Sequence, residues 1–179
     1  MKTFKSILIL LLVVMGTTSC SDKNSLRNYF LDHAEKAGFS SSTIPVSLLK
    51  QEGMQFTKKQ EEALEAVDRV NLLFYRPENM KQEEFTTEKN NVKAILNQEK
   101  YEELINLGRN GVIKYIGNDD TIDEIIAFVS EKEMGFAVMR IIGNDMTLEK
   151  FMELYKMSEQ RSTPFNFDLG NLSNLMSSN

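Results

Sequence analysis

Four apolar segments in the second half of the chain are separated by short turns that contain glycine or asparagine. The segments cover residues 102–107, 112–116, 122–129 and 136–142. Glycine and asparagine tolerate the positive φ angles that tight hairpins require. This spacing predicts an antiparallel meander, which restricts the chain to folds built around a β-sheet. The first segment begins with two glutamates, so it could equally extend a preceding helix.

The rest of the chain alternates helical patterns with shorter strand patterns. Apolar residues at helical spacing predict helices over residues 25–37, 57–68 and 82–98, and another from 148 onward. Thr57 opens the second helix with the spacing of a capping box. Residues 40–43 predict a polar turn, and residues 44–48 an edge strand or strand start, because Pro45 cannot donate a ladder hydrogen bond. Residues 70–75 are apolar at nearly every position, which predicts a central strand.

Together these patterns predict an α+β fold in a single domain, with helices packed on one face of a mostly antiparallel sheet. The domain is expected to cover residues 25–157, and the alternative is two small units divided near Met80. Residues 158–179 are rich in serine and asparagine, and we expect them to form a disordered polar tail. Scattered apolar residues in this tail leave docking onto the domain as the alternative.

Cys20 is the only cysteine in the chain, and it follows a segment typical of an exported protein. Lys2 and Lys5 precede an apolar run over residues 7–15, and small or polar residues then lead to the cysteine. This order predicts a secretory signal peptide, because the run is too short for an ordinary membrane span. The junction resembles the lipobox of bacterial lipoproteins. We therefore expect residues 1–19 to be the signal peptide and Cys20 to be the lipidated residue.

The expected location follows from this junction. Residues 20–24 would form a lipidated tether, and the lipid anchor would hold the protein at a membrane of the cell envelope. Ser21 follows Cys20, and Asp22 is the one acidic residue before the predicted first helix. This pattern favours the outer membrane, with the domain facing the periplasm. A modified Cys20 leaves no thiol for an internal disulfide, so stability must come from a packed core.

The charge of the chain limits its partners. The chain has 21 basic and 26 acidic residues, a formal net charge of −5, and no cluster of lysine and arginine. Affinity for nucleic acid comes largely from basic residues that neutralise phosphates. Nucleic acid is therefore not an expected partner, and the binding partner is expected to be a protein or a small ligand that the sequence does not identify.

No motif for catalysis, metal binding or a cofactor stands out. His33 is the only histidine, and its place on an apolar helical face predicts a packed side chain. The acidic run over residues 118–124 lacks the central glycine and the ligand spacing of a calcium loop. Adjacent glutamates elsewhere do not face a common point. We expect a non-enzymatic binding domain with no catalytic residue, no metal and no cofactor; the alternative is a hydrolase whose carboxylates meet only in the fold.

Several stretches carry a resemblance to a known family. They are LRNYFLDHAEKAGFSSSTIPVSLLK, VDRVNLLFYRPEN, YEELINLGRNGVIKYIGN and IDEIIAFVSEKEMGFAVMRIIGNDMTLEKF, which together reach from about Leu26 to Phe151. With the lipobox, they resemble the DUF4252 family of Bacteroidota lipoproteins. The resemblance implies an envelope lipoprotein with an α+β sheet domain. It implies no reaction, because the family has no assigned function.

Overall fold

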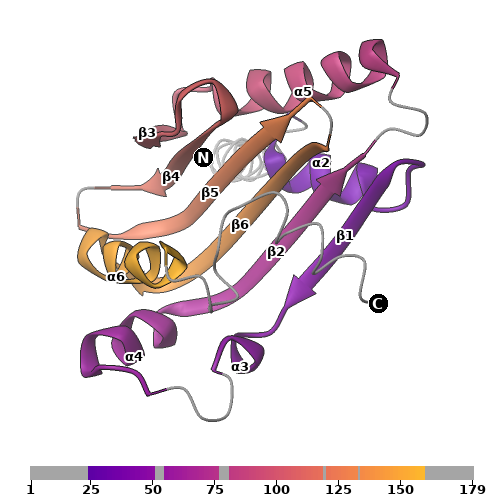
Figure 1. The fold of residues 1–179 in the computed structure, drawn as a ribbon. Helices are drawn as coiled ribbons and strands as arrows, with labels where there is room; N and C mark the ends of the chain where they lie inside the picture. Colours follow the sequence, from indigo (N-terminus) through magenta and orange to yellow (C-terminus); the bar gives the residue numbers. More distant parts are fainter. Residues whose placement is uncertain (1–23, 51–54, 77–80, 119, 133, 160–179) are drawn as a thin grey trace, which may run out of the picture.

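A six-stranded antiparallel sheet forms the centre of the molecule (Figure 1). The computed structural model describes residues 24–50, 55–76, 81–118, 120–132 and 134–159. Its strands are β1 (Phe39–Ile44), β2 (Val67–Tyr75), β3 (Glu102–Asn106), β4 (Gly111–Gly117), β5 (Ile122–Glu131) and β6 (Gly135–Met146). The helices are α2 (Leu26–His33), α3 (Val46–Leu49), α4 (Lys58–Glu65), α5 (Gln82–Leu96), α6 (Leu148–Glu159) and the 3-10 helix η2 (Gly108–Asn110). The predicted α+β class is confirmed.

The strand order is β1-β2-β6-β5-β4-β3, and every neighbouring pair is antiparallel. The predicted meander is confirmed as β3 to β6, and its first segment is a strand rather than a helical extension. At the β5–β6 turn, Gly135 has a φ of 106°, which a residue with a side chain rarely adopts. Because β2 pairs with β6, the segments on either side of Met80 share one sheet, and the fold is a single domain.

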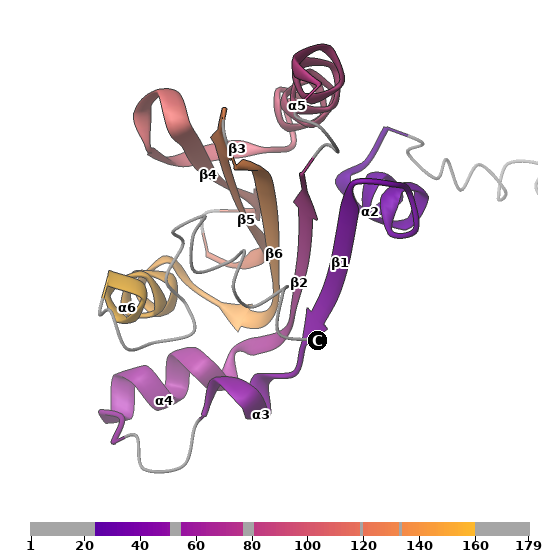
Figure 2. The same ribbon diagram turned by 45° about the vertical axis from the view of Figure 1, so that its right-hand side comes forward.

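Both faces of the sheet are apolar, and each packs against its own pair of helices (Figures 1 and 2). Leu72 belongs to the core under α4 and α6, whereas its neighbour Leu73 belongs to the core under α2 and α5. The prediction that helices pack on one face is therefore wrong. Strands β2, β5 and β6 are apolar at consecutive positions, and such strands need cover on both faces. Helical periodicity alone does not say which face a helix will cover.

The edge strand lies earlier in the chain than its sequence predicted. Residues 40–43, predicted as a turn, belong to β1, which pairs with β2 in continuous register. Pro45 instead precedes α3 as its N-cap. An edge strand needs fewer apolar side chains than a central one. Because β1 consists mainly of serine and threonine, the hydropathy pattern did not predict it as a strand.

The helices begin where local signals place them. The capping box at α4 is present: Thr57 Oγ1 accepts from the Gln60 amide, and the Gln60 side chain accepts from the Thr57 amide. Helix α6 continues to Glu159, past the predicted domain end, and Ser158 is buried in its last turn.

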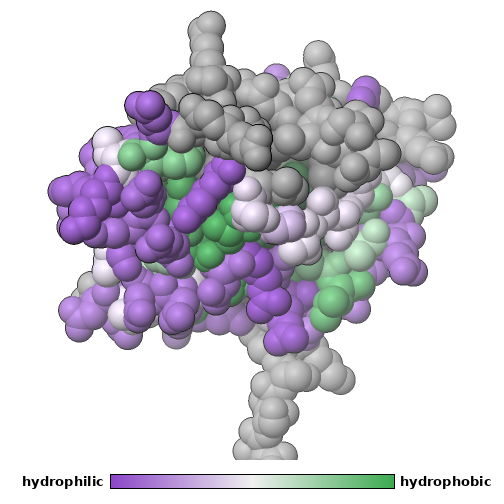
Figure 3. Space-filling model, turned by 90° about the horizontal axis from the view of Figure 1, so that it is seen from below, coloured by the Kyte–Doolittle hydropathy of each residue, from purple (hydrophilic) through white to green (hydrophobic). Residues whose placement is uncertain are grey.

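Lys59 of α4 and Glu149 of α6 form an ion pair of 2.8 Å. On the side where α4 and α6 lie, Figure 3 shows hydrophilic residues around a hydrophobic area.

Three sequence predictions fall outside the described residues. They are the signal peptide over residues 1–19, the lipidation of Cys20, and nearly all of the C-terminal tail, residues 160–179. Among the helices that the structure describes, none combines the length and the apolar character that crossing a membrane requires.

Candidate functional site

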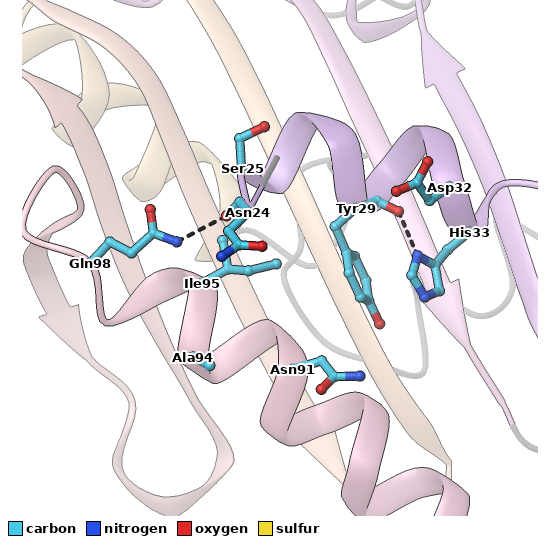
Figure 4. Close-up of a pocket in the computed structure, with 9 residues that line it drawn as sticks. All are labelled: Asn24, Ser25, Tyr29, Asp32, His33, Asn91, Ala94, Ile95 and Gln98. Carbon is cyan, nitrogen blue, oxygen red and sulfur yellow. Dashed lines mark hydrogen bonds between the residues drawn. The ribbon is translucent and has the colours of Figure 1, made fainter. Parts of the chain in front are cut away.

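Helix α2 borders two cavities, one against α5 and one against the open part of the sheet. The first has a volume of about 340 Å³ and is shown in Figure 4. Asn24 and Ser25 lie at the start of α2, Tyr29 and His33 project from the same helix, and Gln98 follows the end of α5. The Gln98 side chain donates to the Asn24 carbonyl at 2.9 Å and so joins the ends of the two helices.

The polar groups near this cavity largely satisfy one another. Tyr29 donates its hydroxyl to Glu88 of α5 at 2.8 Å, and burial together with this hydrogen bond raises the pKa of Tyr29. His33 Nδ1 lies 2.8 Å from the Tyr29 carbonyl, and its Nε2 lies 3.0 Å from Lys36 Nζ. A neutral ring with its proton on Nδ1 fits both contacts, because the ammonium can only donate.

His33 therefore has a structural role in the packing of α2. It is 8% exposed, and its ring stacks on Tyr29 with centroids 3.9 Å apart. Its nearest carboxylate, Glu88, lies 3.5 Å from Nε2 and is already hydrogen-bonded to Tyr29. This network ties α2 to α5.

The second cavity is larger, about 600 Å³, and we call it the arginine groove. Its wall is formed by one side of α2, through Arg27, Phe30, Leu31 and Ala34. Its floor is formed by residues from β1, β2, β4, β5 and β6, among them Thr43, Arg69, Asn71, Ile116, Glu124, Arg140 and Ile142. The groove therefore combines residues that lie more than 100 positions apart in the sequence.

The floor of the groove is open because, along one face of the sheet, the strands change from apolar to polar side chains. In β2, Tyr75 and Leu73 are buried under helices, and the next residues on that face are Asn71 and Arg69. Strand β6 makes a similar change, because Val138 is buried and Arg140 follows it on the same face. Side chains two apart in a strand share a face. The helices cover the wholly apolar half, and the other half, in which polar residues accompany Ile116 and Ile142, remains as the groove.

Arg140 is the most buried charged residue of the groove, at 6% exposed. Its guanidinium donates to both carboxylate oxygens of Glu124, at 2.6 and 2.8 Å, and lies 5.3 Å from the centre of the Phe30 ring. Bidentate pairing of this kind is strong and directional. It neutralises Arg140 and fixes β5, β6 and α2 relative to one another.

Two other arginines of the groove are uncompensated. Arg27 and Arg69 are exposed and have neither an ion pair nor a hydrogen bond within the described part of the chain. Asn71 accepts from the Thr43 hydroxyl at 3.2 Å, which leaves its amide nitrogen available as a donor. Asp123 is the only acidic residue of the lining besides the paired Glu124. The groove is thus locally cationic on a chain whose net charge is −5.

The described residues of the acidic run, 118 and 120–124, lie between β4 and β5 and at the start of β5. Asn118 Oδ1 accepts from the amides of Asp120 and Thr121, and Glu124 faces Arg140; Asp119 lies outside the described residues. The described ranges contain no group of three histidine, cysteine, aspartate or glutamate residues placed to hold a metal ion. The Glu124 side chain is 14% exposed and is held by Arg140.

Sequence reasoning did not identify the arginine groove, although one signal was present. Arg69 and Asn71 continue the alternation of β2 beyond its apolar part, and Arg140 interrupts the apolar run of β6. An arginine inside an apolar strand has to find a partner, since burying an unpaired charge is costly. The sequence does not show that this partner is Glu124, because the pairing of β5 with β6 brings them together.

Comparison with known proteins places the chain in a family. No match was found among curated proteins or among solved structures. A family model described as a domain of unknown function matches residues 29–154, which include all six strands, α3, α4, α5 and most of α2 and α6. The match covers more than half of the chain. The chain therefore belongs to the DUF4252 family.

Proposed function

We propose that the protein is a cell-envelope lipoprotein, anchored by an acyl-modified Cys20, whose domain binds a ligand in the arginine groove. The observation that carries the binding role is the pair of uncompensated guanidinium groups, Arg27 and Arg69, beside the neutralised Arg140. The order of residues 1–20 supports the anchor and a location at the outer membrane, facing the periplasm.

The lining indicates the chemistry of the ligand. Arg27 and Arg69 offer planar donors that match a carboxylate or a phosphate. Leu31, Ile116 and Ile142 supply apolar surface in the same groove. Binding sites for small ligands commonly join apolar lining with a few polar groups that fix orientation. We infer a ligand that has an apolar body and one oxyanion group.

The groove fits binding better than hydrolysis. A carboxylate-dependent hydrolase needs two acids that converge on one bond. Of the two acids in the groove, Glu124 is held by Arg140 through both oxygens, and Asp123 is exposed.

Replacing Cys20 with serine is expected to release the protein from membranes or to leave an unprocessed precursor, because a hydroxyl cannot form the thioether. Membrane fractionation and intact mass measure the result. Ser21→Ala keeps the thiol and is expected to behave like the wild type. A Cys20→Ser protein that has the mass and membrane partitioning of the wild type would contradict the anchor.

Replacing Arg69 with alanine is expected to weaken binding of an aromatic oxyanion by at least about tenfold, since hydrogen bonds to charged groups contribute about 1.5–3 kcal/mol. Benzoate and phenyl phosphate serve as probes, and ligand-observed NMR titration of the full chain gives their affinities. The two probes distinguish a carboxylate site from a phosphate site.

Arg109→Ala is the matched control for this test. Arg109 is an exposed arginine of η2, which lies between β3 and β4, at the edge of the sheet farthest from β1. Its removal changes the net charge equally and is expected to leave binding unchanged. Equal weakening by Arg69→Ala and Arg109→Ala, or equal binding of uncharged benzyl alcohol, would refute the oxyanion site.

A further inference from the structure

The two edges of the sheet differ in how they are protected against pairing with another strand. Edge strand β3 has Glu102 and Glu103 at its start and an irregular register after them. Charges and bulges of this kind discourage strand addition. Edge strand β1 has six residues, Phe39–Ile44, without a charge, a proline or a register shift. Its outer edge is therefore competent to pair.

The backbone groups on that outer edge can be identified. The Arg76 amide donates to the Gly38 carbonyl at 2.8 Å, so these two residues form a hydrogen-bonded pair between β1 and β2. Hydrogen-bonded and non-bonded pairs alternate along an antiparallel ladder. The backbone amides and carbonyls of Ser40 and Ser42 consequently point toward β2, whereas those of Ser41 and Thr43 point outward.

An exposed apolar side chain accompanies this edge. Leu31 of α2 is 68% exposed, and it lines the arginine groove together with Ser41, Ser42 and Thr43. Leu31 and Leu148 are the two large apolar side chains that are strongly exposed within the described ranges. A strand added beside β1 would extend the floor on the open side of the groove, near Leu31.

We propose that β1 pairs antiparallel with β1 of a second copy of this chain, in a two-fold symmetric dimer. In the proposed register Ser41 pairs with Thr43 of the second copy, Thr43 with Ser41, and Ser42 lies opposite Ser42 at the axis. Centring the axis on Thr43 would instead place Ser41 opposite Pro45, which has no amide, and centring it on Ser41 would place Thr43 opposite Phe39, whose amide already donates to the Lys36 carbonyl. The register centred on Ser42 gives four backbone hydrogen bonds across the axis. A strand without charged residues can pair with itself without the repulsion that like charges cause.

The symmetry also suits a membrane tether, and this argument rests on the proposed lipid anchor. Two antiparallel strands in one continuous sheet are related by an axis perpendicular to that sheet. Helix α2 lies on one face of the sheet (Figure 2). In the proposed dimer both α2 helices therefore share one face. Both tethers, which join α2 at Asn24, can then reach one membrane. Tethering raises the effective concentration of one copy near the other.

Cysteine cross-linking in membranes tests this register. Ser42→Cys places two thiols opposite each other in a non-bonded pair, where the Cα atoms lie about 4.5 Å apart, within the range of a disulfide. Mild oxidation followed by non-reducing electrophoresis is expected to give a covalent dimer. Ser40→Cys is the matched control, because Ser40 lies opposite Ile44 of the second copy and its thiols cannot meet. Adding Thr43→Pro to Ser42→Cys removes an outward amide and is expected to reduce cross-linking severalfold.

Each outcome has a defined meaning. Dimer from Ser42→Cys that exceeds dimer from Ser40→Cys severalfold, and that falls with Thr43→Pro, supports the pairing. Equal cross-linking of the two cysteine variants, or no cross-linking of a Ser42→Cys protein whose circular dichroism matches the wild type, overturns it. Cross-linking of the wild type would show that Cys20 is a free thiol; that result contradicts the lipid anchor and leaves the comparison of the two variants intact in a Cys20→Ser background.

Discussion

Truncating Phe136 to alanine is expected to lower the free energy of unfolding by about 3–5 kcal/mol, as for other large aromatic residues in cores. Phe136 is fully buried at the start of β6. The centroid of its ring lies within 6.5 Å of the centroids of four other aromatic rings, those of Phe39, Tyr75, Phe85 and Phe128. The truncation therefore removes contacts with β1, β2, α5 and β5 at once. Urea denaturation followed by circular dichroism measures the loss.

Leu148→Ala is the control for this truncation, because Leu148 is 53% exposed at the start of α6. Its loss of stability is expected to stay below about 1 kcal/mol, since little apolar area leaves the core. A loss of similar size for Phe136→Ala would mean that the aromatic cluster does not hold the two halves of the chain together.

Replacing Arg140 with methionine is expected to lower the free energy of unfolding by about 3–5 kcal/mol, because it leaves the largely buried Glu124 carboxylate without its partner. The side chains of Arg140 and Glu124 are 7% and 14% exposed. The loss also includes the contact of the guanidinium with the Phe30 ring. Denaturant unfolding measures it directly.

The double variant Arg140→Met with Glu124→Leu separates pairing from packing. Replacing both members of a buried ion pair with apolar residues is often neutral, whereas removing one member leaves a charge behind. We expect the double variant to be more stable than Arg140→Met alone. If the two variants lose stability equally, the ion pair contributes nothing and Arg140 acts through packing only.

Helix starts and hairpin turns could be predicted because their causes are local. The capping box at Thr57 and Gln60 needs residues only three positions apart, and the structure has it. The glycine-containing turns of the meander likewise impose a backbone angle at one residue, as at Gly135. The apolar run of β2 requires an interior strand wherever its partners lie.

The placement of β1 shows where local patterns fail. Its hydroxyl residues, Ser40 to Thr43, have no hydropathy alternation, and their strand conformation depends on pairing with residues 71–74 of β2. The apolar pattern of residues 44–48 suggested an edge strand, but β1 ends at Ile44 and Pro45 precedes a short helix. When a strand is stabilised mainly by backbone hydrogen bonds to its neighbour, its own side chains do little to predict that it is a strand.

The sequence by itself determined the α+β class, the meander and the starts of most helices, because periodicity and turn chemistry act over a few residues. Only the tertiary structure decided that helices cover both faces of the sheet and that Arg27, Arg69 and Arg140 meet in one groove. Those arrangements depend on strand pairing between residues about 70 positions apart, as between β2 and β6. The sequence shows that an amphipathic helix needs a surface to cover and that an isolated arginine needs a partner for its charge. The long-range pairing of the sheet determines which residues provide them.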